Sequence, residues 1–174
     1  MSRWKIAALM GAFALFSLGI GIAGRPPGAR YPRFLRLAMR AKRAADHGRY
    51  EQASYLAHKL LELAEQYRHD WNYGNALHHG HLVLGRAALA VQDLASARNR
   101  LLLAGQTSGS PQLNSFGPNM RLALDLLRAG QRDVVLEYFK LCRRFWEMGT
   151  DQLDAWAADI AEGREPKFGA NLRY

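Results

Sequence analysis

Apolar residues in the middle of the chain recur at three- and four-residue spacing. The clearest stretch is LGRAALAVQDLASARNRLLLA, residues 84–104, which has a polar break at Gln92 and Asp93. Such spacing places side chains on one face of an α-helix, so the stretch predicts two helices folded back on each other. Small residues that would let the two backbones approach closely are Gly85, Ala88, Ala97 and Ala104.

Two further stretches show the same pattern on either side of a glycine. One covers residues 33–67 and turns at Gly48; the other covers residues 121–145 and turns at Gly130. A hairpin of this kind leaves an apolar face that only a neighbouring hairpin can cover. We therefore expect a stack of helix pairs, closed at its end by a helix over Gln152–Ala161 that turns Trp156 and Ile160 inward.

The central hairpin resembles a known repeat. Leu84 and Gly85, followed by Ala97 and Ala104, are similar to the tetratricopeptide (TPR) repeat, a 34-residue unit with Leu-Gly in its first helix and two small residues seven apart in its second. The resemblance implies an all-α fold. The implied arrangement is a short right-handed stack of antiparallel helix hairpins over residues 34–162. The resemblance implies no particular enzymatic reaction.

The flanking hairpins match the repeat less closely. In the earlier unit Gly48, Tyr50 and Ala53 fit the turn and the opening of the second helix, whereas Leu60 replaces the second small residue. A third unit has Gly130, Val135 and Cys142 at the corresponding places. Ala53 and Ala97 are 44 residues apart and Ala97 and Val135 are 38 apart, so insertions are expected between the units.

In TPR proteins the first helix of each unit lines a concave groove that receives a peptide or another protein. The groove residues that the resemblance implies are Leu35, Lys42, Asp46, His79, Leu82, Arg86, Leu89, Leu124 and Arg128. Lys42, Arg86 and Arg128 would suit acidic peptides or C-terminal carboxylates, although the same charges fit a solvated face equally well. The carboxylate-clamp pattern of the family is absent, because Ala38 and Val83 stand where it needs Lys and Asn.

The N-terminal part contains IAALMGAFALFSLGIGIA, residues 6–23, eighteen residues without a charge. As a helix this run is about 27 Å long, close to the hydrocarbon core of a bilayer. It predicts a single-pass membrane anchor, and its length favours an anchor over a cleaved secretory signal. Residues 24–33 form an expected Pro/Gly/Arg linker, residues 163–174 an expected tail, and the side of the membrane stays open.

The formal charge of +9 is concentrated at one end of the chain. Residues 1–43 hold nine basic and no acidic side chains, and in the rest of the chain basic and acidic residues balance. A folded face built to bind nucleic acid would carry its own excess of positive charge. The pattern therefore excludes nucleic acid as the expected partner and favours an anionic lipid surface next to the anchor.

Histidines between residues 69 and 81 offer the main candidate for chemistry. His78 and His81 are three residues apart, a spacing that suits two metal ligands on one helix face, and His69 and Asp70 could complete a site. A His-dependent metal-binding protein or hydrolase is therefore the alternative function. Without a HExxH-type frame such a pair more often serves packing and capping, so we expect no metal and no cofactor.

No other pattern predicts catalysis. Ser115 lacks the GxSxG frame of a nucleophilic serine, and Cys142 has no histidine or acid within a helical turn to activate it. We therefore expect a protein that is not an enzyme: a membrane-tethered, TPR-like scaffold with a protein or peptide partner in its groove. Self-association through uncovered end repeats is a further possibility.

Overall fold

A computed structural model describes residues 30–173 of the chain, and within them the only regular elements are helices. This confirms the all-α prediction for the described part. The α-helices are α2 (Arg30–Asp46), α3 (Tyr50–Ala64), α4 (Tyr73–Ala90), α5 (Leu94–Gly105), α6 (Pro111–Phe116), α7 (Arg121–Arg128), α8 (Arg132–Cys142) and α9 (Thr150–Ala161). Short 3₁₀ turns are η1 (Glu65–Tyr67), η2 (Glu147–Gly149) and η3 (Gly169–Leu172).

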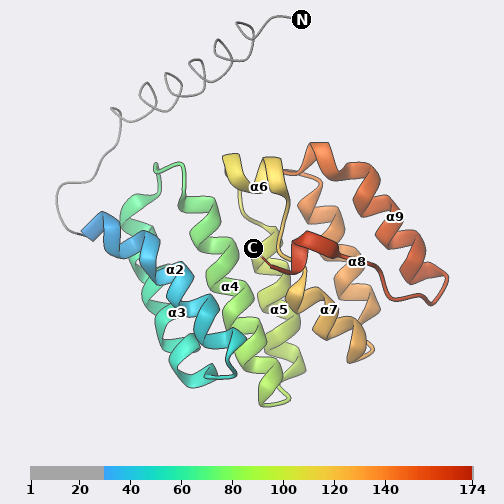
Figure 1. Cartoon of the computed structure of the whole chain (residues 1–174), viewed down its shortest axis with the longest axis horizontal. Coiled ribbons are helices and arrows are strands. Elements are labelled where there is room, and N and C mark those ends of the chain that lie inside the picture. The colour runs from blue at the N-terminus through green and yellow to red at the C-terminus, as the bar shows by residue number, and fades with distance from the viewer. Residues whose placement is uncertain (1–29, 174) are drawn as a thin grey trace, which may run out of the picture.

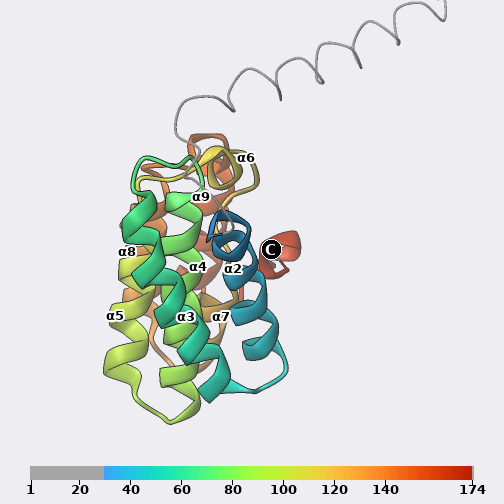
Figure 2. The same cartoon turned by 90° about the vertical axis from the view of Figure 1, so that its left-hand side faces the viewer.

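The long helices lie side by side, and successive ones run in opposite directions (Figure 1). Seen from the side, α5 and α8 lie on one face of the molecule and α2 and α7 on the other (Figure 2). Helix α4 occupies the centre, where it packs against α3 and α5 and also contacts α2 and α7. The segment that precedes the C-terminus crosses the face formed by α2 and α7.

Three tight turns form the hairpins where the sequence predicts them. Gly48 joins α2 to α3 at φ +69°, and Gly130 joins α7 to α8 at φ +76°. Both dihedrals lie in the left-handed region that glycine adopts without strain. Between α4 and α5 the left-handed residue is Gln92, and the Asp93 carboxylate caps α5 by accepting a hydrogen bond from the Ser96 N–H at 2.9 Å.

The predicted close approach of small residues is confirmed at Gly85. A Cβ at this position would lie 2.3 Å from Leu122 Cδ2 of α7 and 3.1 Å from Arg100 Cβ of α5. Ala97 and Ala104, on the facing side of α5, have no exposed surface. Three helices therefore meet around Gly85.

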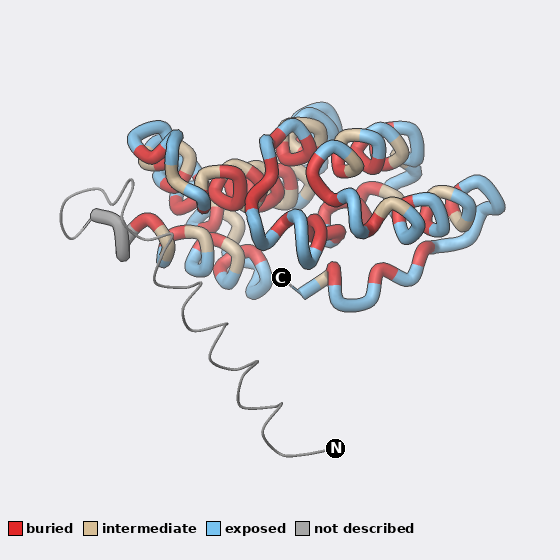
Figure 3. Tube along the Cα trace, turned by 90° about the horizontal axis from the view of Figure 1, so that it is seen from above, coloured by how far each residue is buried: buried red, intermediate tan, exposed pale blue. Residues whose placement is uncertain are grey.

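Two hydrophobic clusters make up the core, and α4 contributes to both. The first cluster combines α2 and α3 with Val83 and Leu84 of α4. The second combines α5, α7, α8 and α9 with Leu82 of α4, and it includes the predicted inward residues Trp156 and Ile160. Buried positions accordingly follow the inward faces of the helices (Figure 3).

The insertion expected between the second and third hairpins contains a short helix, α6, whose start is capped by Ser110 accepting a hydrogen bond from the Leu113 N–H at 3.1 Å. Phe116, the last residue of α6, is 63% exposed. The closing helix α9 begins at Thr150, and the Thr150 hydroxyl donates to the Glu147 carbonyl. Helix α2 begins at Arg30 and so includes four residues of the expected linker.

The expected membrane anchor, residues 6–23, lies outside the described residues. Among the residues that are described, no helix combines the length and the apolar character needed to cross a bilayer.

Candidate functional site

Much of the expected groove converges on one small cavity. Its volume is about 20 Å³, room for about one water molecule. The cavity is lined from α2 by Lys42 and Asp46, from α4 by His79, Leu82, Val83 and Arg86, and from the C-terminal half by Asn119, Arg121 and Leu172. The resemblance assigned side chains from Lys42 to Arg86, a stretch of 45 residues, to one groove. In the structure these side chains line the same cavity.

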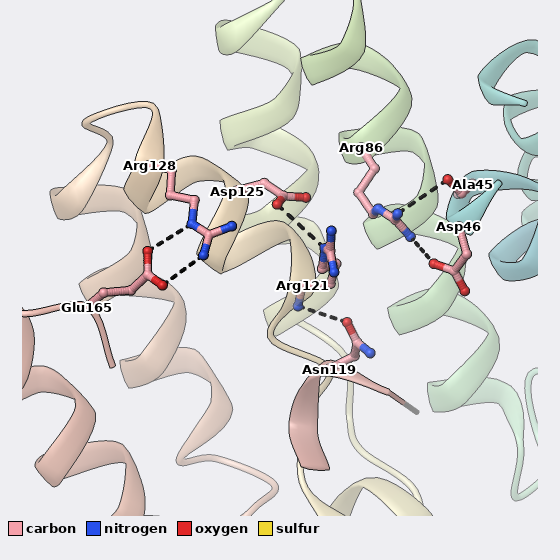
Figure 4. A network of polar contacts seen from close by, with 8 residues as sticks. All are labelled: Ala45, Asp46, Arg86, Asn119, Arg121, Asp125, Arg128 and Glu165. Atoms are coloured by element: carbon pink, nitrogen blue, oxygen red, sulfur yellow. Dashed lines mark hydrogen bonds and ion pairs between the residues drawn. The ribbon is translucent and has the colours of Figure 1, made fainter. Parts of the chain in front are cut away.

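Arg86 is the most constrained charge in this cavity (Figure 4). Its guanidinium donates to Asp46 Oδ1 at 2.7 Å and to the Ala45 carbonyl at 3.3 Å, and its side chain is 10% exposed. Its Nε is buried and has no hydrogen-bond partner within the described part of the chain. A buried N–H without an acceptor raises the free energy of the folded protein, and an acceptor that paired with this N–H would lower it again.

The cavity carries more positive than negative charge. Burial lowers the pKa of Lys42, the nearby Asp46 carboxylate opposes that shift, and the charge of Arg86 adds to it. Arg121 also lines the cavity and is paired with Asp125 at 3.5 Å. Among the lining residues there are thus three cationic side chains, Lys42, Arg86 and Arg121, and one carboxylate, Asp46.

The chain's own C-terminal segment covers this cavity. Asn171 is held through both its main chain and its side chain: its main-chain carbonyl accepts from the Met120 N–H at 2.7 Å, and its side-chain nitrogen donates to the Phe116 and Pro118 carbonyls at 3.1 and 2.9 Å. Leu172 lines the cavity, and the Lys42 ammonium donates to the Arg173 carbonyl. The face therefore already holds a short peptide segment.

The tail is anchored upstream by Phe168, which is 2% exposed. Its ring packs edge to face against Trp156 with centroids 4.9 Å apart, and against Phe139 at 6.2 Å. In the structure Phe168 and Leu172 pack on the second hydrophobic cluster and hold the tail that was expected at residues 163–174. Sequence reasoning missed Asn171, because a single asparagine in a short polar tail carries no pattern that marks it.

A second, larger cavity adjoins the first and shares His79 and Asn119 with it. Its volume is about 310 Å³. The other lining residues are Asn75, Gln112, Leu113, Phe116 and Gly117, none of them charged. We call the two adjoining cavities together the groove. Sequence reasoning missed this half because α6, which supplies Gln112, Leu113 and Phe116 to its wall, is too short to show a helical repeat.

The wall between α4 and α6 is fixed by a buried amide network. The Asn75 side-chain nitrogen donates to Asn72 Oδ1 at 2.6 Å and to Gln112 Oε1 at 2.7 Å. Its oxygen accepts from the Ser110 hydroxyl at 2.8 Å. Because the Asn75 amide is fully engaged, this wall keeps its shape without a ligand.

His78 lies behind the groove and has a structural role. It is completely buried, its Nδ1–H donates to the Ala104 carbonyl at 3.0 Å, and its Nε2 accepts from the Asn119 N–H at 3.1 Å. Burial lowers its pKa to about 4, so the ring is neutral, as this pair of contacts requires. His78 therefore positions Asn119, one of the two residues that both cavities share.

The other members of the histidine stretch do not join His78 in a ligand set. The ring of His81 lies 3.3 Å from Arg100 Nη1, and the Asp70 carboxylate accepts from the Asn72 N–H at 2.8 Å just before α4. Between residues 30 and 173 no three His, Cys, Asp or Glu side chains come together as a metal site would require. Burial also lowers the pKa of His79 to about 3 and that of His81 to about 4.

The remaining groove candidates lie elsewhere. Leu124 is buried in the second hydrophobic cluster, where Leu89 also packs, and Leu35 packs on the first. Arg128 forms two 2.8 Å hydrogen bonds with the Glu165 carboxylate, well away from Arg86 (Figure 4). It lines a separate cavity of about 120 Å³ with Arg132 and Arg164.

No family model, curated protein or solved structure matches the chain in the three comparisons.

Proposed function

We propose that this protein is a non-catalytic, membrane-tethered scaffold of TPR type, a right-handed stack of hairpins that binds a segment of another protein in its groove. The tether is the apolar run at residues 6–23. The observation that carries the proposal is the chain's own tail, which the groove already holds through Asn171 and Leu172. A partner segment would take the same place.

The contacts of the tail are those by which a protein holds any peptide. The Met120 N–H and the Phe116 and Pro118 carbonyls are backbone groups, and they pair with an amide side chain and a main-chain carbonyl. Met120 and Pro118 are buried residues, so these groups would lose hydrogen bonds without an occupant. The groove therefore favours a segment with an asparagine-like amide at this position.

The open cavity and the charges add specificity. A cavity of about 310 Å³ lies at the lower end of ligand-pocket sizes and can receive an apolar side chain between Leu113 and Phe116. Lys42, Arg86 and Arg121 favour a carboxylate nearby, since complementary charge speeds encounter and selects partners. The partner we infer carries an apolar residue, an amide and an acidic residue within a short extended segment.

The alternative, a His-dependent metal protein or hydrolase, lacks a comparable supporting observation. Both ring nitrogens of His78 are engaged by backbone groups, and the Nδ1 of His81 faces a cation. We therefore do not propose it.

A labelled peptide tests the scaffold proposal. The probe is PKFGANLR, residues 166–173, and the protein is the full chain with Asn171→Asp and Leu172→Asp, which weakens its own tail. We expect this variant to bind the peptide with a micromolar Kd by fluorescence anisotropy, and the natural chain to bind at least tenfold more weakly because its tail occupies the groove.

A control peptide completes the experiment. With aspartate in place of Asn171 it should not bind, because it loses both donors to the Phe116 and Pro118 carbonyls. If the variant keeps its thermal transition and yet binds no peptide at millimolar concentration, the groove is not a peptide site and the proposal fails.

A further inference from the structure

Three large apolar side chains are exposed at one end of the helix stack. Trp71 is 48% exposed, Phe116 63% and Met148 84%. Trp71 lies in the turn before α4, Phe116 ends α6, and Met148 lies in η2 just before α9. The whole of α6 and the starts of α4 and α9 lie at the same end of the molecule (Figure 1).

These segments pack against one another and together form the surface of that end. The Thr107 hydroxyl donates to the Gly74 carbonyl at 3.1 Å, which ties the start of α4 to the segment before α6. Helix α6 in turn contacts η2. A Cβ at Gly117 would lie 2.5 Å from Trp146 Cε2, so the two segments pack without a gap. We call this surface, with Trp71, Phe116 and Met148, the apolar end.

The described chain begins beside the apolar end. Phe34, in the first turns of α2, packs against Tyr67 with ring centroids 5.1 Å apart, and Tyr67 precedes Trp71 by four residues, most of them in turns. Only six residues, 24–29, separate the proposed span from the start of α2. Six residues extend over about 20 Å at most, so the start of α2 must lie within that distance of the bilayer.

We propose that the apolar end docks on the surface of the bilayer that residues 6–23 span. This inference rests on the tether of the proposed function. Tryptophan is enriched at the membrane interface, and phenylalanine and methionine gain free energy when their side chains leave water for the acyl boundary. The basic residues between 25 and 43 add attraction to anionic headgroups.

Docking would be shallow, and it would place the groove close to lipid. Glu147 and Asp151 flank Met148 and are exposed, so their carboxylates limit this end to the depth of the headgroups. Phe116 also lines the open cavity of the groove. A partner segment that emerges from the same membrane would therefore meet this cavity first.

Spin labels on the full chain test the docking. The protein is reconstituted in vesicles of phosphatidylcholine and phosphatidylglycerol at about 3:1, with a nitroxide at Phe116→Cys or Met148→Cys. The matched control is Val91→Cys, a 75% exposed apolar position at the turn between α4 and α5. Cys142 is fully buried and should not be labelled.

We expect the ratio of oxygen to nickel-complex accessibility to be at least threefold higher at positions 116 and 148 than at position 91. Water-like accessibility at either of the first two positions overturns the docking. Alkaline carbonate extraction of the same vesicles separates the two proposals. A chain that resists extraction but has water-like labels keeps its tether and lacks the docking, whereas a chain that is extracted has no tether at all.

Discussion

At the scale of single residues, His78 shows how a metal-like spacing arises from packing. Its two ring nitrogens join the end of α5 to the loop before α7, through the Ala104 carbonyl and the Asn119 N–H. The sequence shows a histidine three residues before His81 but does not show which way either ring points. The burial of His78, which decides its role, depends on α5 and α8, elements distant in the chain.

The buried histidines predict a loss of stability in acid. Burial lowers the pKa of His78 to about 4 in the folded chain, below about 6.5 in the unfolded chain. Above pH 6.5 the ring is neutral in both states, and below it only the unfolded chain takes up the proton. The free energy of unfolding should therefore fall between pH 6.5 and 4 by about 1.4 kcal/mol per pH unit for each fully buried imidazole.

Urea unfolding at pH 7.5, 6.5, 5.5 and 4.5 measures this slope. His78→Gln should reduce it by about 1.4 kcal/mol per pH unit, because one depressed imidazole is removed. The same variant should also lose about 1–3 kcal/mol at pH 7.5, since a glutamine side chain does not reproduce both backbone contacts. An unchanged slope in the variant would contradict the assignment of His78 as a neutral buried ring.

At the scale of elements, periodicity and turn chemistry predicted the long helices. Gly48 and Gly130 mark two turns, and the apolar spacing marks the faces of α3, α5 and α8. Helix α6 could not be found in this way, because its six residues are too few for a repeat of 3.6 to show. Its position depends on Asn75, 37 residues away from Gln112.

The crossing of α4, α5 and α7 predicts the effect of Gly85→Ala. Alanine favours an isolated helix by about 1 kcal/mol, but the new Cβ would lie 2.3 Å from Leu122 Cδ2, and Leu122 has no exposed surface into which to move. Overpacking of this kind costs about 1–3 kcal/mol, so we expect a net loss in chemical denaturation. If the Gly85→Ala variant were as stable as the natural chain or more stable, α4 and α7 would have to lie further apart than the structure places them.

The tail predicts a local effect of Asn171→Ala. The change removes the donors to the Phe116 and Pro118 carbonyls and should loosen η3 by about 1–3 kcal/mol without unfolding the helices. The Met120 amide, which donates to the Asn171 carbonyl, should then exchange with solvent about 5- to 150-fold faster. Amides in the middle of α3 serve as controls and should keep their rates.

At the scale of the whole molecule, the groove is composite, which limits what a single sequence reveals about it. Lys42 comes from α2, Arg86 from α4, Asn119 from the loop before α7, and Leu172 from the tail. The resemblance to a repeat supplied the contributions of α2 and α4, because they belong to the first helix of a unit. It said nothing of the loop and the tail, which lie outside any repeat.

The two hydrophobic clusters predict cooperative unfolding, because α4 supplies Val83 and Leu84 to one and Leu82 to the other. Cys142, the chain's one cysteine, is fully buried in the second cluster, and burial raises the pKa of its thiol. Leu60→Ala, in the first cluster, should cost about 2–5 kcal/mol. If α4 couples the clusters, Leu60→Ala should lower two urea midpoints together. These are the midpoint for reaction of Cys142 with a thiol reagent and the midpoint for loss of helical circular dichroism. Hairpins that unfold independently would instead leave the Cys142 midpoint where it is in the natural chain.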